Sequence, residues 1–309
     1  MPQSAVTTII QEIEFYQPSI VQIKDEHFEE KEVHVSMLRL DEVHPVISGN
    51  KLFKLIYFLK EVQESQHKTM ITFGGPYSNH LAATAFACER LNIKSIGIVR
   101  GEQPKLLSHT LQFCREHEMQ LKFVSRSQWK NLDERFIEEL KFEFGQHILI
   151  PEGGFSIKGK QGASLINEYF QNKNVTHVCL AVGTATTFAG IVEANNKNIE
   201  IIGFGVLKNT KDVPERFTEL QVNPSKKYSF ISDYHFGGYA KKSSELISFM
   251  NRFYEKYSIP LDFVYTGKMM AGVYELIAKN YFPVGSKILC IHTGGLQGNN
   301  SLPKNELVY

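Results

Sequence analysis

The fold class of this chain is indicated most clearly by one stretch, Thr69-Met70-Ile71-Thr72-Phe73-Gly74-Gly75-Pro76-Tyr77-Ser78-Asn79-His80. Its first five residues form a short apolar run that is typical of a buried strand. Gly74-Gly75-Pro76 ends that strand, and a helix is predicted from Asn79 to about Leu91, where apolar residues recur at helical spacing. A strand that ends in glycines and leads directly into a helix is the repeating unit of an α/β protein.

The same unit recurs along most of the chain. An alternating strand is predicted over 32–40, and short apolar strands are predicted at 95–99, 121–124, 147–150, 176–182, 199–206 and 287–292. Helices are predicted at about 52–66, 106–118, 132–144, 160–171, 186–197, 241–257 and 268–280. This alternation predicts an α/β fold with open, twisted, mostly parallel sheets that carry helices on both faces.

The length of 309 residues suggests about two domains. No low-complexity linker separates them, so we place the boundaries where the chain crosses between compact α/β segments. The prediction is a smaller domain over 52–165 and a larger, discontinuous domain that combines 1–51 with 166–309.

Composition limits the classes of function. The chain is 42% hydrophobic and 22% charged with a formal net charge of +1, so no basic field favours nucleic acid or an anionic membrane. The four cysteines lie far apart without metal-binding spacing, which favours a reducing compartment and no metal site. No apolar run reaches the ~18–20 residues of a membrane helix. We therefore expect a cytoplasmic protein with no membrane or nucleic-acid partner.

Lys51 is the first candidate for chemistry. It follows the turn Ser48-Gly49-Asn50 and precedes an amphipathic helix. A lysine at such a junction is either an ordinary exposed side chain or an amine nucleophile. These residues alone leave both interpretations open.

Two loops after strands are candidates for ligand binding. Ser78-Asn79-His80 opens a helix at the carboxyl end of a strand, where parallel sheets bind ligands, although Ser78 or Asn79 could simply cap the helix. Gly183-Thr184-Ala185-Thr186-Thr187 has the small residues and hydroxyl groups that suit a phosphate. It lacks the lysine of an NTPase loop, and a plain tight turn is the alternative.

Further candidates follow later strands. Tyr265 could stack on a planar ligand or act as an acid, although a buried core tyrosine is the commoner case. Tyr239 lies beside another glycine-rich turn. A lysine on a turn, a phosphate-type loop and an asparagine at a helix start together indicate pyridoxal 5′-phosphate, which needs an amine, a phosphate cup and polar ring partners.

Several motifs in order then resemble one family. Ser48-Gly49-Asn50-Lys51-x-x-Lys54-Leu55, Ser78-Asn79-His80, Tyr265-Thr266-Gly267-Lys268-x-Met270-x-Gly272 and His292-Thr293-Gly294-Gly295 resemble the 1-aminocyclopropane-1-carboxylate deaminase and D-cysteine desulfhydrase family. Members are pyridoxal-phosphate enzymes of the tryptophan synthase β-like architecture, also called fold type II. The resemblance runs from about residue 35 to the end.

The resemblance implies a role for each matching residue. Lys51 would hold the cofactor as a Schiff base and move the substrate α-proton, and Asn79 would hydrogen-bond the ring hydroxyl. The phosphate would be bound by Lys54 and by Gly183, Thr184, Ala185, Thr186 and Thr187. Thr266 would lie at the pyridine nitrogen. The substrate would be bound by Ser78, Asn79, His80, Tyr239 and Tyr265, and catalysis would involve Lys51, Ser78, Tyr239 and Tyr265.

Thr266 and Thr293 also bear on the reaction that the resemblance implies. Deaminases of the cyclopropane amino acid carry Glu and Leu at these positions, so the two threonines favour a D-cysteine desulfhydrase-like β-elimination from a small D-amino acid. Products would be pyruvate, ammonia and sulfide. The alternatives are the cyclopropane deaminase, racemisation or dehydration of an amino acid, and a non-catalytic amino-acid-binding protein. A homodimer is expected by analogy.

Overall fold

The computed structural model describes residues 8–208 and 212–309, and within these the chain forms two compact units. The smaller unit comprises residues 8–15 and Lys51–Gly162, and the larger unit comprises Tyr16–Asn50 and Ala163–Tyr309. The sequence-based division assigned 8–15 to the larger domain. In the structure they group with the smaller unit, where the Phe15 ring packs edge-on against Phe53 with 5.4 Å between centroids.

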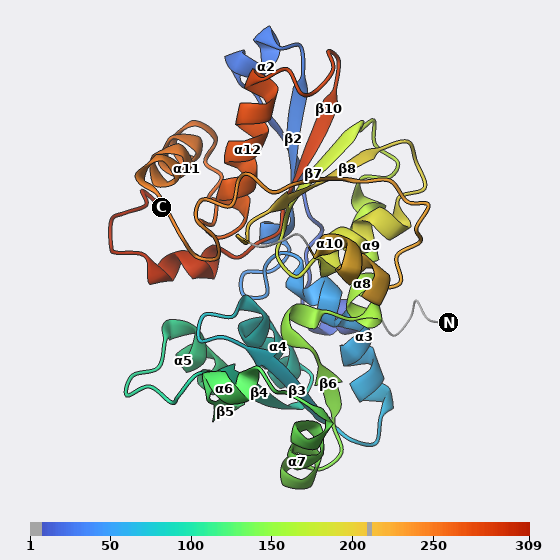
Figure 1. Cartoon of the computed structure of the whole chain (residues 1–309), viewed down its shortest axis with the longest axis vertical. Coiled ribbons are helices and arrows are strands. Elements are labelled where there is room, and N and C mark those ends of the chain that lie inside the picture. The colour runs from blue at the N-terminus through green and yellow to red at the C-terminus, as the bar shows by residue number, and fades with distance from the viewer. Residues whose placement is uncertain (1–7, 209–211) are drawn as a thin grey trace. The chain divides into compact units, whose positions relative to one another are not determined.

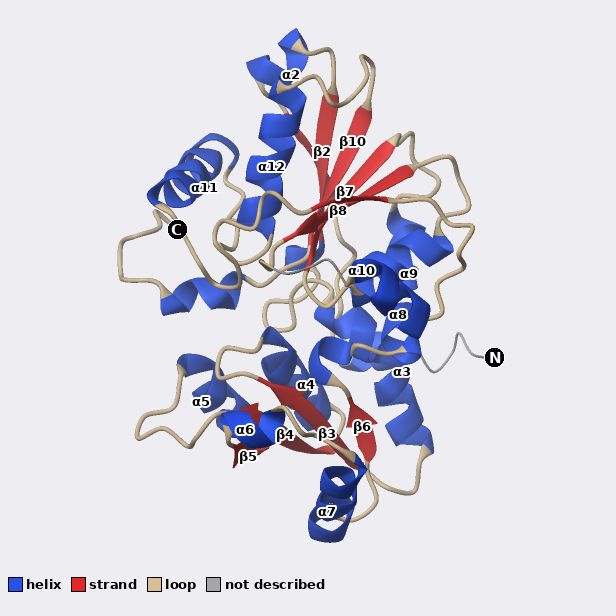
Figure 2. Cartoon of the chain, in the orientation of Figure 1, coloured by secondary structure: helices blue, strands red, loops and turns tan. Residues whose placement is uncertain are grey.

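The smaller unit is built on a parallel sheet of four strands in the order β5-β4-β3-β6 (Figure 2). The strands are β3 (Thr69–Gly74), β4 (Lys94–Arg100), β5 (Gln120–Val124) and β6 (Ile148–Ile150). The helices are α3 (Lys51–Glu64), α4 (Asn79–Arg90), α5 (His109–Glu116), α6 (Arg126–Trp129) and α7 (Glu134–Phe144), with a short 3-10 turn, η2 (Glu152–Gly154). Apolar side chains of α4 and α5 pack in one core cluster, and those of α6 and α7 pack in a second one. Both clusters include strand residues, as expected for a parallel sheet.

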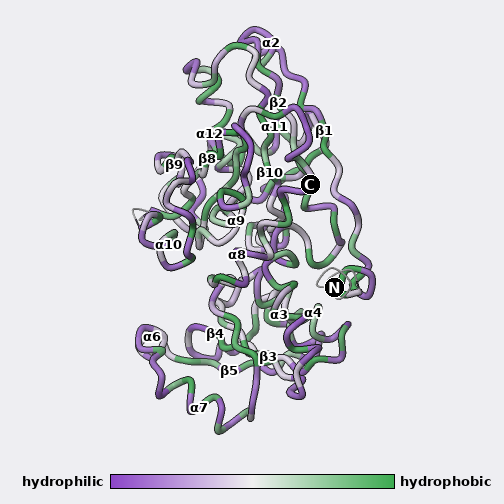
Figure 3. Tube along the Cα trace, turned by 90° about the vertical axis from the view of Figure 1, so that its right-hand side faces the viewer, coloured by the Kyte–Doolittle hydropathy of each residue, from purple (hydrophilic) through white to green (hydrophobic). Residues whose placement is uncertain are grey.

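The larger unit has six strands in the order β1-β2-β10-β7-β8-β9, of which only the β1–β2 pair among these described strands is antiparallel. The strands are β1 (Ile20–Ile23), β2 (His34–Arg39), β7 (His177–Val182), β8 (Glu200–Gly205), β9 (Ser229–Ile231) and β10 (Lys287–His292). All residues of β7 are buried, which fits a central parallel strand. Figure 3 shows hydrophobic and hydrophilic stretches alternating along the trace.

Helices surround the sheet of the larger unit (Figure 1). They are α2 (Glu26–Glu30), α9 (Thr186–Ala194), α10 (Val213–Glu219), α11 (Ser244–Tyr257) and α12 (Thr266–Ala278), with 3-10 turns η1 (Leu40–Glu42), η3 (Leu165–Tyr169) and η4 (Leu296–Ser301). Helix α12 approaches the sheet closely at Gly272, where an added Cβ would lie 2.8 Å from Phe204 Cε1 and from Tyr234 Cγ. The glycine therefore sets how near α12 lies to β8, the strand that carries Phe204.

The predicted fold class is confirmed, and the differences are local. The helix predicted over 160–171 is instead α8 (Ile157–Ser164) followed by η3, and β1, α2, α6, α10 and β9 were not predicted. Helix α8 passes close to α3 at Gly162, where a Cβ would lie 1.9 Å from the carbonyl oxygen of Phe53. Such short or closely packed elements carry little hydrophobic periodicity, which explains why the pattern missed them.

Within 8–208 and 212–309, none of the helices combines the length and apolar composition needed to cross a membrane. The same part of the chain holds no group of three or more His, Cys, Asp or Glu side chains that could bind a metal ion.

Candidate active site

Lys51 is the first residue of α3 and directly follows a tightly held turn. Gly49 has a φ of 77°, and an added Cβ would lie 1.9 Å from the Thr293 carbonyl oxygen, so only glycine suits this position. The Asn50 backbone N–H donates to the same carbonyl at 3.2 Å, and its side-chain Nδ2 donates to Thr187 Oγ1 at 2.8 Å. The residue before Lys51 is thus fixed to the end of β10 and to the start of α9.

Lys54 lies one turn further along α3 and is almost fully buried. Its amine donates to the Gly153 carbonyl at 2.6 Å. Burial, and then the nearby positive charge of Lys51, lower the pKa of Lys54 well below its ordinary value. No carboxylate forms an ion pair with Lys54 among the described residues, so this amine is available to an anion such as a phosphate.

Ser78 caps α4, because its Oγ accepts the Leu81 backbone N–H at 3.2 Å. The capping interpretation of Ser78 is therefore confirmed. Capping uses an acceptor site of the hydroxyl and leaves its hydrogen for another partner. The next residue differs, since Asn79 Oδ1 is shielded from solvent and has no hydrogen-bond partner within the described part of the chain.

His80 presents a second acceptor of this kind. Its Nε2 lies 3.0 Å from Thr72 Oγ1, and the Thr72 hydroxyl donates its hydrogen to the Ile150 carbonyl at 3.0 Å. Nε2 must therefore carry the ring hydrogen and donate it to Thr72, so Nδ1 is an acceptor. Nδ1 is buried and has no partner among the residues that the structure describes. Burial, followed by the charges of Lys54 and Lys51, lowers the pKa of His80 well below its ordinary value and keeps the ring neutral.

The smaller unit thus combines two lysines with two unsatisfied acceptors, one on Asn79 and one on His80. Buried polar atoms normally have partners, because leaving one unpaired costs about 1–3 kcal/mol. A ligand with suitable donors would remove this cost. The start of α4 is therefore suited to bind a polar small molecule.

In the larger unit, the loop 183–187 joins β7 to α9 through Ala185, a residue with a φ of 65°. The first turn of α9 contains no acidic side chain, and the hydroxyls of Thr184 and Thr186 lie 3.1 Å apart. Arg216 Nη1 lies 3.4 Å from the Thr184 carbonyl, which it contacts as a donor. Free backbone N–H groups at a helix start, with hydroxyl donors and no competing carboxylate, form a site for an anion.

Tyr265 lies next to this loop within the larger unit. An added Cβ on Gly183 would be 3.2 Å from Tyr265 Cε1, so the glycine allows the ring to come close. Tyr265 itself immediately precedes α12. The structure therefore brings Tyr265 and the predicted phosphate loop together.

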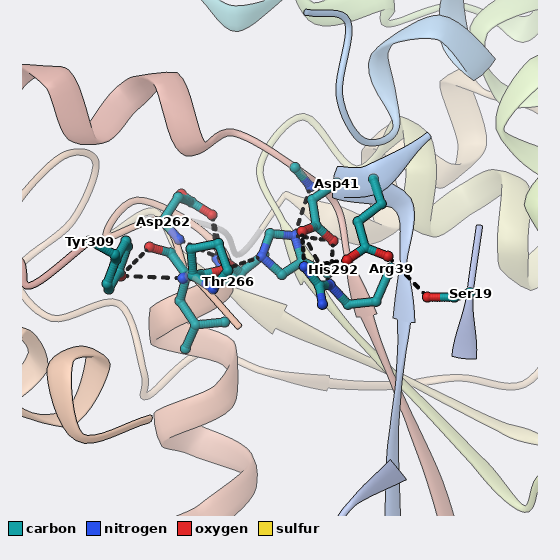
Figure 4. Close-up of polar contacts among 11 residues, drawn as sticks. Ser19, Arg39, Asp41, Asp262, Thr266, His292 and Tyr309 are labelled. Atoms are coloured by element: carbon teal, nitrogen blue, oxygen red, sulfur yellow. Dashed lines mark hydrogen bonds and ion pairs between the residues drawn. The ribbon is translucent and has the colours of Figure 1, made fainter. Parts of the chain in front are cut away.

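Asp262 organises the start of α12 (Figure 4). Its Oδ1 accepts the backbone N–H groups of Val264 at 3.0 Å and Tyr265 at 2.7 Å. Its Oδ2 accepts the Thr266 backbone N–H at 2.9 Å and the Thr266 hydroxyl at 2.6 Å. The four donors satisfy the carboxylate, which has about four acceptor sites.

These bonds alter the interpretation of Thr266. The threonine is fully buried, its hydroxyl hydrogen is donated to Asp262, and its oxygen accepts the Asp262 backbone N–H at 2.9 Å. In this arrangement the hydroxyl hydrogen is used by Asp262, and the placement of Thr266 at the pyridine nitrogen stays a prediction. The two bonds also show that Thr266 helps to begin the helix.

The loop before α12 is also tied to the rest of the larger unit (Figure 4). His292 Nε2, at the end of β10, donates to the Pro260 carbonyl at 2.8 Å. Tyr309 donates its hydroxyl to the Leu261 carbonyl at 2.6 Å and accepts the Leu261 N–H at 3.2 Å. Tyr265 is therefore held by a loop with several independent anchors.

Tyr239 is the remaining predicted residue, and its side chain is half exposed. It follows a turn whose carbonyls contact Lys268, a buried lysine in α12. Sequence reasoning assigned no role to Asp262 or Lys268. The available signals were an acidic residue just before a helix and a lysine among the small and apolar residues of the first two turns of that helix.

Comparison with known proteins identifies the family. The pattern of the family described as "Pyridoxal-phosphate dependent enzyme" matches residues 26–294. The chain belongs to this family. The pyridoxal-phosphate dependent enzyme is 31% identical over 271 residues to a Pyrococcus abyssi (strain GE5 / Orsay) protein named "Putative 1-aminocyclopropane-1-carboxylate deaminase", covering 82% of this chain and 81% of the relative.

A second relative carries two activities in its name. It is "Bifunctional D-cysteine desulfhydrase/1-aminocyclopropane-1-carboxylate deaminase, mitochondrial" of Arabidopsis thaliana, 29% identical over 287 residues, with 82% of this chain and 70% of the relative covered. The solved structure of an ACC deaminase homologue superposes with a TM-score of 0.79 at 25% identity, and 96% of each chain is covered. O-ureido-L-serine synthase shares the fold, with a TM-score of 0.70 at 12% identity and 95% and 93% coverage.

The cofactor of this enzyme is therefore pyridoxal 5′-phosphate, as predicted. The polar groups of the predicted site residues suit this cofactor. The loop 183–187 and the start of α9 suit the phosphate, Lys51 supplies an amine at a fixed turn, and Asn79 and His80 offer unpaired acceptors for hydroxyl or amine hydrogens.

Proposed function

We propose that this pyridoxal-phosphate enzyme catalyses β-elimination from a small D-amino acid, with D-cysteine as the substrate. The Cα–H and Cβ–S bonds of D-cysteine break, and water completes the conversion to pyruvate, ammonia and hydrogen sulfide. The names of the two relatives support an amino-acid lyase or deaminase of this class. The structure supports the choice between their reactions through the start of α12.

The observation that carries the choice is the saturated carboxylate of Asp262. Residue 266 is threonine, and the Asp262 carboxylate beside it already accepts four hydrogen bonds. A free carboxylate here could keep a pyridine nitrogen protonated, which makes the ring a stronger electron sink. Opening a cyclopropane requires such a sink, whereas elimination of a good leaving group such as a thiol requires it less. The α12 start therefore favours β-elimination.

We propose the following residues for the cofactor. Lys51 binds it covalently, Lys54 and the loop 183–187 bind its phosphate, and Asn79 Oδ1 accepts a hydrogen from its ring hydroxyl. When bound, the cofactor withdraws electrons from the substrate α-carbon. The buried amine of Lys54 and the hydroxyls of Thr184 and Thr186 support the phosphate assignment.

We propose that the substrate is bound by Ser78, His80, Tyr239 and Tyr265. Ser78 keeps its hydroxyl hydrogen for the substrate carboxylate, since its oxygen accepts the cap hydrogen bond. Neutral His80 accepts an N–H or O–H hydrogen at Nδ1. Lys51 takes the α-proton, and the two tyrosines supply hydroxyl groups near the departing sulfur.

The cyclopropane deaminase is the second candidate, favoured by the names of both relatives. One experiment separates the two. The purified enzyme is incubated with D-cysteine, L-cysteine, D-serine and the cyclopropane amino acid, and keto acid and sulfide are assayed. Sulfide release from D-cysteine, abolished by Lys51→Ala together with the visible band of the bound cofactor, supports the proposal. Ring opening without sulfide release contradicts it.

We also propose that the enzyme is a cytoplasmic homodimer. The near-neutral net charge and four buried free thiols support a reducing compartment without nucleic-acid or membrane partners. Light scattering of the purified chain tests the oligomeric state, and a molar mass of one chain would contradict it.

A further inference from the structure

The amine of Lys268 is a buried polar group that the proposed chemistry does not use. Its side chain is fully buried in the first turn of α12. The amine donates to the His235 carbonyl at 2.9 Å and to the Gly238 carbonyl at 2.7 Å. Burial lowers the pKa of Lys268 to about 8, although the charge of Asp262 acts in the opposite direction. An apolar side chain would fill this space without that desolvation cost, so the contribution specific to lysine is the pair of carbonyl contacts.

The two carbonyls belong to one tight turn, and the turn has a backbone that needs support. Phe236, Gly237 and Gly238 have φ values of 48°, 88° and 114°. The Gly238 N–H donates to the His235 carbonyl at 2.9 Å, and the Gly237 N–H donates to His235 Nδ1 at 3.0 Å. A positive φ is unfavourable for a residue such as Phe236. The lysine therefore stabilises a turn conformation that the chain does not adopt readily.

The turn leads directly into Tyr239. Gly238, whose carbonyl accepts the shorter of the two Lys268 bonds, is its neighbour in the chain. The Tyr239 side chain is half exposed. Because Tyr239 directly follows Gly238 in the chain, a change in the backbone of this turn would move the tyrosine side chain with it.

The first turn of α12, which carries Lys268, directly follows Tyr265. Tyr265 is the residue before α12, and its backbone N–H donates to Asp262 at 2.7 Å. Lys268 is three residues further along the chain, on the first turn of a regular helix. The start of α12 is thus connected to both tyrosines, to Tyr265 through the backbone and to Tyr239 through the Lys268 amine.

We infer that Lys268 is a positioning residue that sets the Tyr239 hydroxyl relative to Tyr265 for the reaction. This inference rests on the proposed function, because it takes Tyr239 as a residue that contacts the substrate. Misplacing a catalytic group by about 1 Å can cost about 100-fold in rate. The amine acts at a distance from the substrate, through a backbone turn.

The test is a double-mutant cycle on the holoenzyme with D-cysteine. Lys268→Met keeps the length and apolar stem of the side chain and removes the donor. We expect it to lower kcat/KM by about 10- to 100-fold. In a Tyr239→Phe background the same change should alter kcat/KM less than about twofold, because the group that Lys268 positions is already absent. Lys279→Met, at the exposed end of α12, is the matched control and should have no effect in either background.

A second experiment observes the surroundings of Tyr239 directly, without measuring turnover. The holoenzyme is labelled with 3-fluorotyrosine, and its ¹⁹F spectrum is recorded without substrate, with Tyr239→Phe identifying the signal of Tyr239. Lys268→Met should shift or broaden that signal, and Lys279→Met should leave it unchanged. If Lys268→Met does not fold, Lys268→Gln, which keeps an N–H donor, takes its place in both experiments and should show a smaller loss in the same direction.

The outcomes distinguish a failure of the role inferred for Lys268 from a failure of the role proposed for Tyr239. Equal losses from the Lys268 change in both backgrounds, or an unchanged ¹⁹F signal, would overturn the inference while leaving the proposed function intact. Unchanged turnover in Tyr239→Phe alone would remove Tyr239 from the proposed function, and the inference with it.

Discussion

The helices α4 and α12 both begin after a loop that carries predicted site residues, yet they use their polar atoms in opposite ways. At the start of α4, Asn79 Oδ1 and His80 Nδ1 are buried without partners among the described residues. At the start of α12, the Asp262 carboxylate accepts four hydrogen bonds and the Thr266 hydroxyl both donates and accepts. The unsatisfied groups at the start of α4 are thus suited to a ligand, whereas the saturated groups at the start of α12 hold the chain that presents other residues.

The largest effect is expected from Asp262→Ala, which removes all the bonds that the carboxylate accepts. Hydrogen bonds to a charged group contribute about 1.5–3 kcal/mol each, and several buried donors lose their partner together. We expect the free energy of unfolding to fall by about 3 kcal/mol, measured by chemical denaturation followed by circular dichroism. The control is Asp133→Ala at the exposed cap of α7, which should cost about 1 kcal/mol. Equal losses for both variants would remove the distinction between the two helix starts.

The next prediction concerns an unsatisfied acceptor. Asn79→Ala removes an oxygen that is buried without a partner, so the free energy of unfolding of the cofactor-free protein should not fall and should rise by up to about 1–3 kcal/mol. Its affinity for pyridoxal phosphate, measured by titration of the visible absorption, should fall about 10- to 100-fold, since the ligand loses an acceptor. Asn299→Ala, whose Nδ2 donates to the Leu261 carbonyl at 3.0 Å and whose Oδ1 accepts the Phe263 N–H at 3.2 Å, should instead lose about 1 kcal/mol of stability. A destabilised Asn79→Ala with normal affinity would contradict the account.

The pH dependence of stability tests whether His80, at the start of α4, is neutral in the folded protein. Its folded-state pKa lies well below the ordinary 6.5, so the unfolded chain binds a proton that the folded protein does not. Stability should therefore rise as pH increases toward about 6.5 and be lost as pH falls below it, by up to about 1.4 kcal/mol per pH unit. His80→Gln cannot titrate, so the difference in unfolding free energy between the two proteins should change over this window. If the unfolding free energies of the two proteins changed equally with pH, His80 would not be held neutral in the folded protein.

The smallest expected effect is at Ser78, the cap of α4. Ser78→Ala should lower the free energy of unfolding by about 1 kcal/mol, and Ser78→Thr should retain it because threonine also caps. Thermal unfolding of the two variants measures the difference. If Ser78→Ala loses much more turnover than its loss of folded protein explains, Ser78 contacts the substrate carboxylate. If the loss of turnover matches the loss of folded protein, Ser78 serves only as a helix cap.

Much of the fold could be predicted because its strands are short, apolar and regularly spaced. The predicted strand 176–182 corresponds to β7, and 287–292 corresponds to β10. The order β1-β2-β10-β7-β8-β9 could not be predicted, because strands that are distant in sequence pair in it. The three-residue strand β9 gave no periodic signal.

The site was predictable where a motif lies on one loop and not where contacts span the chain. Ser78, Asn79 and His80 stood out because they follow a strand and open a helix. The bonds from Lys268 to the carbonyls of His235 and Gly238 join residues about thirty positions apart, and nothing local in the sequence indicates them. The use of the Thr266 hydroxyl by Asp262 was hidden for a related reason, since threonine alone does not show its hydrogen-bond partner.

The most direct test of the contrast between the two helix starts is a crystal structure of the enzyme with pyridoxal phosphate and a D-amino acid bound. We expect Asn79 Oδ1 and His80 Nδ1 each to gain a ligand atom within hydrogen-bond distance, while Asp262 keeps the four bonds that it accepts from the α12 start. If both acceptors remain without partners and the Thr266 hydroxyl turns from Asp262 to the pyridine nitrogen, the account is contradicted.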